Sequence, residues 1–262
     1  MTAEGFSEET LHILEKKPGA VMREIRNKIA QYGGEFVFAA MAVMFVMAAF
    51  LAVKGAVRMT AGTDVEEDKR RCVVIDAGHG GTDPGKVGIN GAREMDINLQ
   101  IALRVKALLE QQDIRVVMTR ESEAAMYEGS GNRKVQDMKR RIELIEKEKP
   151  DITVSIHQNS YPEEYVKGAQ VFYYKDSPES KDAAEMMQRS LVKRLDPNNH
   201  REAKANGSYY LLKKTSSPII IVECGFLSNS EEAELLVSEE YQEKVAWAIH
   251  MGILQKLNHV IK

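Results

Sequence analysis

Three short apolar runs of the sequence each end near a side chain that can bind a metal ion or carry a proton: His79, His157 and Glu223. Such runs are typical of strands that are buried on both faces of a sheet, and the carboxyl ends of parallel strands share one edge of that sheet. Side chains that lie far apart in the sequence are therefore expected to meet there. A binding or catalytic site at this edge is the first prediction.

Glu94 adds a carboxylate to the two histidines. It follows His79 by fifteen positions, at the far end of a glycine-rich loop and just before a helical pattern. Two histidines and one carboxylate with an open fourth position describe a catalytic zinc centre, which activates water for hydrolysis. His79, Glu94 and His157 supply that set. Glu223 is then left as a general base that takes a proton from the attacking water and passes it to the leaving amine.

Each of these residues also has a purely structural interpretation. A single histidine is more often a structural residue than a metal ligand, and His200 competes for the role of ligand. The glycine-rich loop lacks both the Lys-Ser/Thr ending of a phosphate-binding loop and the GxGxxG spacing of a dinucleotide fold. Asp76 either orients a ligating histidine or caps the turn. Spacing alone leaves both the zinc site and the structural interpretation open.

Strands alternate with helices along the chain after residue 70, which predicts an α/β fold. We expect a three-layer sandwich, in which a mostly parallel, twisted sheet of about six strands has helices on both faces. The strands are expected at 72–75, 114–118, 151–155, 167–174, 209–212 and 219–222. The helices are expected at 96–111, 132–149, 180–194 and in a C-terminal region that ends near 257. A polar loop is expected at 196–207, and Ser228 has the spacing of a capping box with Glu231.

The sequence before residue 71 has a different character. Residues 1–35 are polar, 36–53 contain no charged side chain, and 54–70 have the composition of a linker. An uncharged helix of 18 residues spans about 27 Å, close to the thickness of the hydrocarbon core of a bilayer. We therefore expect a transmembrane signal anchor at 36–53, with a buried soluble helix or a cleaved signal peptide as alternatives. Segment 71–262 is then the catalytic domain.

Composition excludes some classes of function. The net charge of -3 and the pI near 6.1 give no electrostatic basis for binding nucleic acid, and no basic stripe with interleaved aromatics is present. The two cysteines, Cys72 and Cys224, are too few for a disulfide framework or a thiolate zinc site. Both lie in apolar runs, so buried free thiols are expected.

Four motifs, in this order and at these separations, carry a family resemblance: VVIDAGHGG, AREMDINLQIA, VSIHQNS and PIIIVECGFLSN. They resemble the zinc-dependent N-acetylmuramoyl-L-alanine amidases of the amidase-3 family, over about 71–257. The resemblance implies one zinc ion per chain, with His79, Glu94 and His157 as its ligands and Glu223 as the catalytic glutamate. It implies hydrolysis of the amide between the lactyl group of muramic acid and L-alanine in bacterial peptidoglycan.

Within the family, several stretches look most like the germination-specific spore-cortex amidases: NRKVQDMKRR, SIHQNSY, KGAQVFYY and KANGSYYLLKKTSSP. That similarity implies a product of peptide-free muramic acid, which is later converted to muramic lactam. The alternatives are a vegetative cell-wall amidase, a zinc hydrolase of another specificity, and a non-catalytic wall-binding relative. No long insertion that could block the site separates 114–118 from 151–155, so control by expression or by an accessory activating protein is expected.

Two further expectations depend on this function. Basic residues on the two sides of 36–53 are too evenly distributed to fix an orientation. The extracytoplasmic placement of the catalytic domain follows instead from the implied wall or cortex substrate. Substrate contacts are expected from polar groups near strand ends or in loops, with surface solvation as the alternative: Arg140, Arg141, Asn159, Asn206 and Tyr210.

Overall fold

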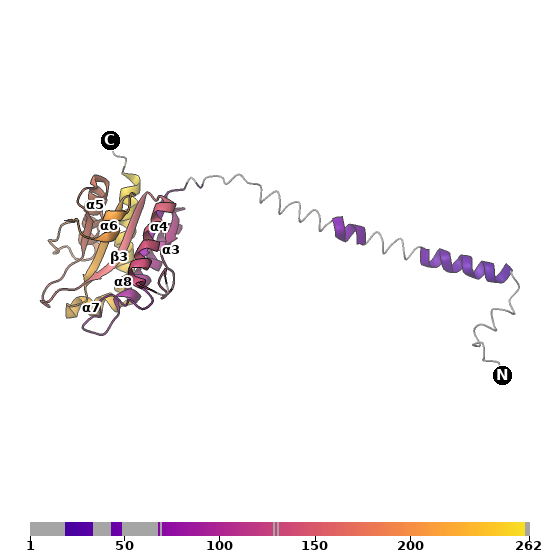
Figure 1. Ribbon diagram of the computed structural model, residues 1–262, viewed down its shortest axis with the longest axis horizontal. Coiled ribbons are helices and arrows are strands. Elements are labelled where there is room, and N and C mark those ends of the chain that lie inside the picture. Colours follow the sequence, from indigo (N-terminus) through magenta and orange to yellow (C-terminus); the bar gives the residue numbers. More distant parts are fainter. Residues whose placement is uncertain are drawn as a thin grey trace. The chain divides into compact units, whose positions relative to one another are not determined.

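The computed structural model describes residues 19–33, 43–48, 68, 70–127, 129 and 131–259. The chain divides into two units, Met1–Asp68 and Lys69–Lys262 (Figure 1). In the first unit, 19–33 and 43–48 are helical. Among the described residues no helix is both long and apolar enough to cross a membrane. Most of 36–53 lies outside the described residues, so the anchor stays a prediction.

The second unit is built on a single mixed sheet. Its strands are β1 (Cys72–Ala77), β2 (Arg115–Met118), β3 (Ile152–Asn159), β4 (Gln170–Tyr174), β5 (Lys204–Asn206) and β6 (Ile219–Phe226). They lie in the order β2-β1-β3-β6-β4-β5. Strands β2, β1, β3 and β6 are parallel, whereas β4 runs antiparallel to β6 and carries β5 parallel to itself at the edge. The expected mostly parallel sheet of six strands is confirmed. Two of the strands, β4 and β5, run opposite to the other four.

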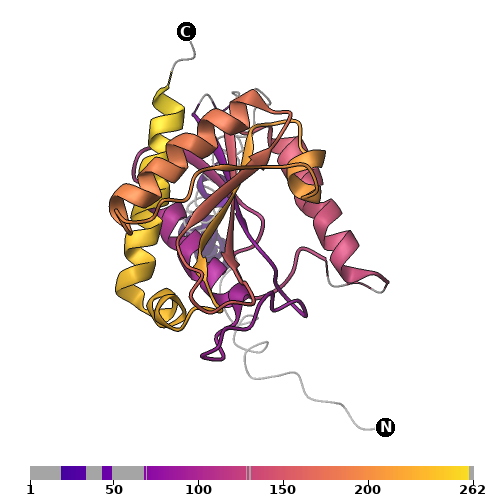
Figure 2. The ribbon, with the colours of Figure 1, turned by 90° about the vertical axis from the view of Figure 1, so that its left-hand side faces the viewer.

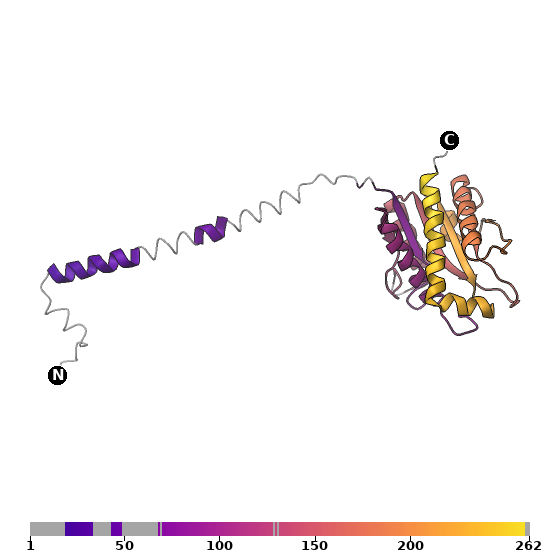
Figure 3. The ribbon, with the colours of Figure 1, turned by 180° about the vertical axis from the view of Figure 1, so that it is seen from behind.

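Helices cover both faces of this sheet. They are α3 (Glu94–Glu110), α4 (Arg133–Glu148), α5 (Pro178–Arg194), α6 (Tyr210–Lys214), α7 (Ser230–Val237) and α8 (Glu239–Asn258). Helices α3 and α5 each pack on α8, and the three cover one face of the sheet, whereas α4 and α6 pack on the other face (Figures 2 and 3). The expected three layers are therefore present in the described part of the chain.

The alternation of side chains along β1 decides which residues face which layer. Val73 and Ile75 lie in the larger core under α3, α5 and α8, whereas Val74 packs with Ile145 of α4 in the smaller core. Because side chains alternate with a period of two, Asp76 shares the face of Val74 and points toward α4. The buried carboxylate of Asp76 therefore lies between β1 and α4.

Strands β3 and β6 repeat this pattern. Ile156 and Val222 lie in the larger core, so their neighbours His157 and Glu223 face the α4 and α6 side. The two strands are in register there, with His157 paired with Glu223. Both strands run further than expected, which places these residues inside the strands, near their carboxyl ends. The face they share is where a site can form.

Three local expectations were wrong. Residues 210–214 form helix α6 and not a strand, because Asn206 Oδ1 accepts hydrogen bonds from the backbone N–H groups of Ser208 and Tyr209 and turns the chain before them. Residues 204–206, expected in a loop, form the edge strand β5. Helix α7 is capped by Asn229, which accepts a hydrogen bond from the N–H of Glu232, and not by Ser228.

Candidate metal centre

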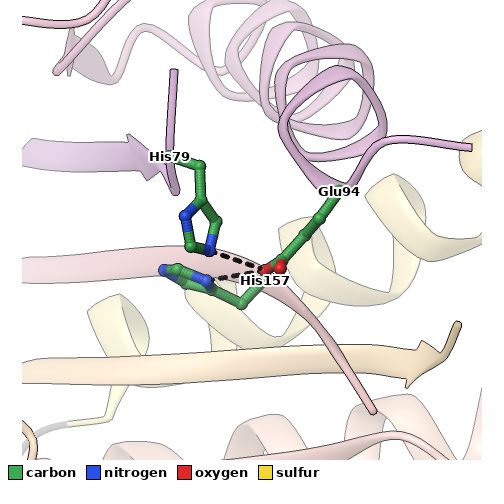
Figure 4. A group of neighbouring side chains, drawn as sticks. All are labelled: His79, Glu94 and His157. Carbon is green, nitrogen blue, oxygen red and sulfur yellow. Dashed lines mark hydrogen bonds and ion pairs between the residues drawn. The ribbon is translucent and has the colours of Figure 1, made fainter. Parts of the chain in front are cut away.

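His79, Glu94 and His157 converge at the carboxyl ends of β1 and β3 (Figure 4). His79 follows β1, Glu94 is the first residue of α3, and His157 lies in β3. One potential ligand atom from each lies within 4.8 Å of the other two. Glu94 Oε1 is 3.2 Å from His79 Nε2 and 2.9 Å from His157 Nδ1. The three side chains are therefore placed to share one cation.

Two glycines of the loop make this approach feasible. A Cβ atom on Gly78 would lie 2.3 Å from the His157 ring. At Gly85, where φ is 69°, a Cβ atom would lie 2.5 Å from Glu94 Oε2 and 2.7 Å from His79 Cδ2. His79 itself has a φ of 64°, which is uncommon for a residue with a side chain. The glycine-rich sequence thus serves close packing around the three donors.

Gly78→Ala is expected to weaken the binding of a divalent metal by about 10- to 100-fold, the usual effect of changes next to a metal ligand. The added methyl group would overlap the His157 ring and force the imidazole away from Glu94. Titration of the metal-free protein with zinc against a competing chelator measures the change. Gly33→Ala, where nothing lies within 4 Å, is the matched control. Unchanged affinity in Gly78→Ala would contradict the placement of His157.

Hydrogen bonds around the three residues hold them in place. His79 Nδ1 lies 3.0 Å from Asp83 Oδ2, which leaves Nε2 facing Glu94. The backbone N–H of Lys86 donates to Glu94 Oε2 at 2.8 Å, and that of Gln158 donates to Oε1 at 3.1 Å. A ligand histidine that is oriented by a carboxylate is a common arrangement in metal sites. The site is therefore rigid before any ion binds.

The electrostatics of the three residues favour positive charge between them. Burial alone would raise the pKa of Glu94, but hydrogen bonds from His157 and His79 outweigh it and hold that pKa well below its usual range. Burial lowers the pKa of His157, but the hydrogen bond to Glu94 and the negative charges of Glu94, Glu223 and Asp76 together outweigh it, so the net shift is upward. A metal cation would supply the positive charge that this arrangement favours.

Glu223 lies beside this group on β6. Its side chain is 9% exposed, and Oε2 is buried without a hydrogen-bond partner. Burial raises the pKa of Glu223 to about 7, because the charged form loses water without gaining a hydrogen bond. An unpartnered carboxylate with such a pKa is suited to exchange protons near neutral pH. This is the chemistry expected of a general base.

A cavity of about 1020 Å³ opens from this group along the face covered by α4 and α6. His79, His157 and Glu223 line it, together with Tyr209 and Tyr210. The size is at the upper end of the range for small-molecule sites. The arrangement therefore combines a metal-binding group, a free carboxylate and room for a substrate.

Of the five expected substrate contacts, two lie in the lining of the cavity and three lie outside it. Tyr210 lines the cavity and stays a predicted contact. Arg141 also borders it, but its side chain is 2% exposed and is bound to Asp76 and Asp137. The other three lie outside the lining: Arg140 pairs with Glu143, Asn159 bonds its own neighbour Ser160, and Asn206 holds the turn before α6. His200, the competing ligand, is exposed and lies outside the group.

Two supporting residues escaped the sequence analysis. Asp83, which orients His79, lies only four positions after it in the same loop, and that spacing was the available signal. Arg120 donates to the backbone carbonyls of Ala77, Gly78 and Met95 and so fixes the loop after β1. Its position two residues after the strand expected at 114–118 was a weaker signal. Cys72 and Cys224 are both buried, as expected.

Comparisons with known proteins agree with this geometry. The family profile described as N-acetylmuramoyl-L-alanine amidase matches residues 73–255. The chain belongs to this amidase family. The germination-specific N-acetylmuramoyl-L-alanine amidase of Bacillus subtilis (strain 168) is 38% identical over 189 residues, which cover 71% of this amidase and 79% of that protein.

Solved structures show the same fold as this amidase. The CwlD amidase from Clostridioides difficile, in complex with the GerS lipoprotein, has a TM-score of 0.69 and 39% identity, covering 72% of this amidase and 98% of that chain. The N-acetylmuramoyl-L-alanine amidase AmiC2 of Nostoc punctiforme has a TM-score of 0.63 and 35% identity, with coverages of 72% and 98%. The amidase unit is thus Lys69–Lys262, which contains every residue of the candidate metal centre.

Proposed function

We propose that the amidase uses one zinc ion, held by His79, Glu94 and His157, to hydrolyse the amide between N-acetylmuramic acid and L-alanine in peptidoglycan. The observation that carries this proposal is the convergence of two imidazoles and one carboxylate beside the unpartnered Glu223. The donor set fits zinc, since two histidines and one carboxylate with an open position are a common catalytic zinc site. Zinc bound there would act as a Lewis acid toward the substrate carbonyl.

The residues of the chain perform the remaining steps. Asp83 and the N–H groups of Lys86 and Gln158 keep the three donors oriented without rearrangement. Glu223 takes a proton from the attacking water and delivers it to the departing nitrogen of L-alanine. The products are a free lactyl carboxylate on the sugar and a peptide with a free amino terminus.

One observation supports a role in the spore cortex. The Bacillus subtilis relative, which is 38% identical over 189 residues, is named as germination-specific. We propose that the amidase strips stem peptides from cortex peptidoglycan before muramic lactam is formed. A vegetative wall amidase would have the same residues at its site. The two roles are therefore distinguished by which substrate, spore cortex or vegetative wall, the enzyme cleaves.

Mass spectrometry of digested peptidoglycan tests both parts of this proposal. Purified, zinc-loaded protein is incubated with spore cortex and with vegetative wall. Release of peptides that begin with L-alanine, and of muramic acid without a peptide, is expected from cortex. Cleavage at a sugar acetyl group or within the peptide would contradict the amidase reaction. Equal or greater release from vegetative wall would contradict the cortex role while leaving the reaction intact.

The placement of the enzyme is part of the proposal. A catalytic domain outside the membrane, anchored through 36–53, would bring the site to its substrate. The Clostridioides difficile neighbour was solved with a lipoprotein, which supports an accessory partner for this amidase as well. Fractionation of cells that express the full chain tests the anchor, because an anchored protein stays with membranes after a high-salt wash.

A further inference from the structure

We propose that Arg133 and Lys134 form a carboxylate-binding subsite that holds the stem peptide on the α4 side of the metal centre. This inference rests on the proposed function and names the part of the substrate that occupies this side of the cavity. Both residues line the cavity that also contains His79 and Glu223. The subsite and the reacting groups are therefore parts of one continuous space.

The position of the two cations is unusual for a helix. Arg133 and Lys134 are the first two residues of α4, and the first turn of this helix contains no acidic residue. The exposed N–H groups of a helix N-terminus favour negative charge, so two cations there are unfavourable unless an anion joins them. The Asn132 side chain caps only the N–H of Val135. The first turn of α4 thus carries two cations and no acidic residue of its own.

The guanidinium group of Arg133 has no acidic partner among the described residues. Its side chain is exposed, and Nε donates to the carbonyl of Gly129 at 3.3 Å. Within the described part of the chain no carboxylate contacts it. The two other arginines of α4 differ, because Arg140 pairs with Glu143 at 2.8 Å and Arg141 with buried Asp76. The planar fork of Arg133 is therefore available for a carboxylate of the substrate.

Lys134 connects the subsite to the metal centre. Its Nζ lies 3.4 Å from Asp83 Oδ2, and Asp83 in turn bonds Nδ1 of His79 at 3.0 Å. The Lys134 side chain is 73% exposed, so its ammonium group keeps room for a second anion. The Asp83 carboxylate thus lies between the Lys134 ammonium group and His79, which is a candidate metal ligand. An anion bound here lies close to the reacting amide.

The carboxylates that line the cavity near α4 already have cationic partners. Asp76 and Asp137 both pair with Arg141, and Asp83 pairs with His79 and Lys134. Glu223 faces the metal centre and carries the proposed proton transfer. Arg133 is the cation of the lining that lacks an acidic partner in the described residues. The charge that complements this part of the cavity is negative.

The two halves of the substrate differ in charge. The muramic acid side of the cleaved amide is neutral, because its lactyl carboxyl group is the one joined to L-alanine. The stem peptide carries free carboxylates, the first on the residue after L-alanine. An extended peptide spans about 7 Å in two residues, which suits an anion that binds beside the metal centre and not at it. The peptide therefore lies toward α4, and the glycan lies on the opposite side of the site.

The experiment compares two soluble muropeptides that differ in one group. In one, the residue after L-alanine has a free α-carboxylate, and in the other that group is an amide. For the zinc-loaded full chain we expect kcat/KM to be about tenfold higher with the free carboxylate, the usual effect of one charge-assisted hydrogen bond. Arg133→Gln should abolish this preference through KM, with kcat unchanged and with little effect on the amidated substrate. Lys134→Gln should reduce the preference for the free carboxylate.

Matched controls lie elsewhere on the surface. Arg189→Gln on α5 and Lys139→Gln further along α4 remove the same charges from exposed positions outside the lining, and both should keep the wild-type preference. No preference in the wild-type chain, or an equal loss on both substrates in Arg133→Gln, would overturn the subsite while leaving the amidase reaction established. If the wild-type chain cleaves neither muropeptide but is zinc-loaded and folded, the proposed function fails and the subsite fails with it.

Discussion

Glu223→Gln is expected to lower kcat for amide hydrolysis by about 10³-fold, within the range typical of a lost general acid–base group. The amide of glutamine has the same shape but cannot take the proton of the attacking water. Because Oε2 of Glu223 has no hydrogen-bond partner, the change breaks no contact of the folded state. The thermal midpoint and the zinc content should therefore stay at wild-type values. Steady-state kinetics and metal analysis of the same preparation measure kcat and the zinc content.

Glu94→Gln is the matched comparison for this variant. Glu94 accepts hydrogen bonds from both histidines and from two backbone N–H groups, so its charge is needed to assemble the donors. That variant should lose zinc together with activity, whereas Glu223→Gln loses activity alone. Wild-type kcat in Glu223→Gln would remove the proton-transfer role of this residue. Loss of zinc in Glu223→Gln would instead make it a ligand.

The sequence predicted that His79, Glu94 and His157 would lie together, because these residues lie near strand ends. His79 and His157 follow or end parallel strands, and such ends meet at one edge whatever the lengths of the connections. Glu94 was found because it precedes a clear helical pattern. The glycines were seen, but their purpose was not, since only the folded chain shows that a Cβ on Gly78 would strike His157.

The errors have a different origin. The run at 209–212 is short and apolar, and such a run does not distinguish a strand from one helical turn. The side chain of Asn206 decides the outcome by turning the chain. Strand β4 runs against its neighbour β6, and no local pattern records that direction. The sequence also could not show that Arg141 is buried against Asp76, because the two residues are 65 positions apart.

Arg141→Met is expected to lower the free energy of unfolding by about 3–5 kcal/mol, the usual cost of leaving one member of a buried ion pair without its partner. The guanidinium of Arg141 is bound to Asp76 at 2.5 Å and to Asp137 at 2.7 Å, and it also donates to the carbonyls of Ala77 and His79. Methionine fills much of the space but satisfies none of these groups. Urea unfolding, followed by the fluorescence of the single tryptophan, Trp247 of α8, measures the loss.

The pH dependence identifies Asp76 as the cause of that loss. Burial raises the pKa of Asp76, but Arg141 and the Ser155 hydroxyl outweigh it, and the net value is about 2. A carboxyl group with a lowered pKa stabilises the fold above its ordinary pKa of 3.8, and this stabilisation disappears as the pH falls toward 2. Without Arg141, burial dominates and Asp76 takes up a proton at higher pH, so the loss of stability in the variant should become smaller between pH 7 and pH 4.

Asp76→Asn in the Arg141→Met background should recover about 1–3 kcal/mol of the free energy of unfolding. Arg140→Met, which removes an exposed pair with Glu143, should change the free energy of unfolding by less than about 1 kcal/mol. A deficit in Arg141→Met that is equally small, or that does not change with pH, would mean that the buried pair does not hold β1 and α4 together.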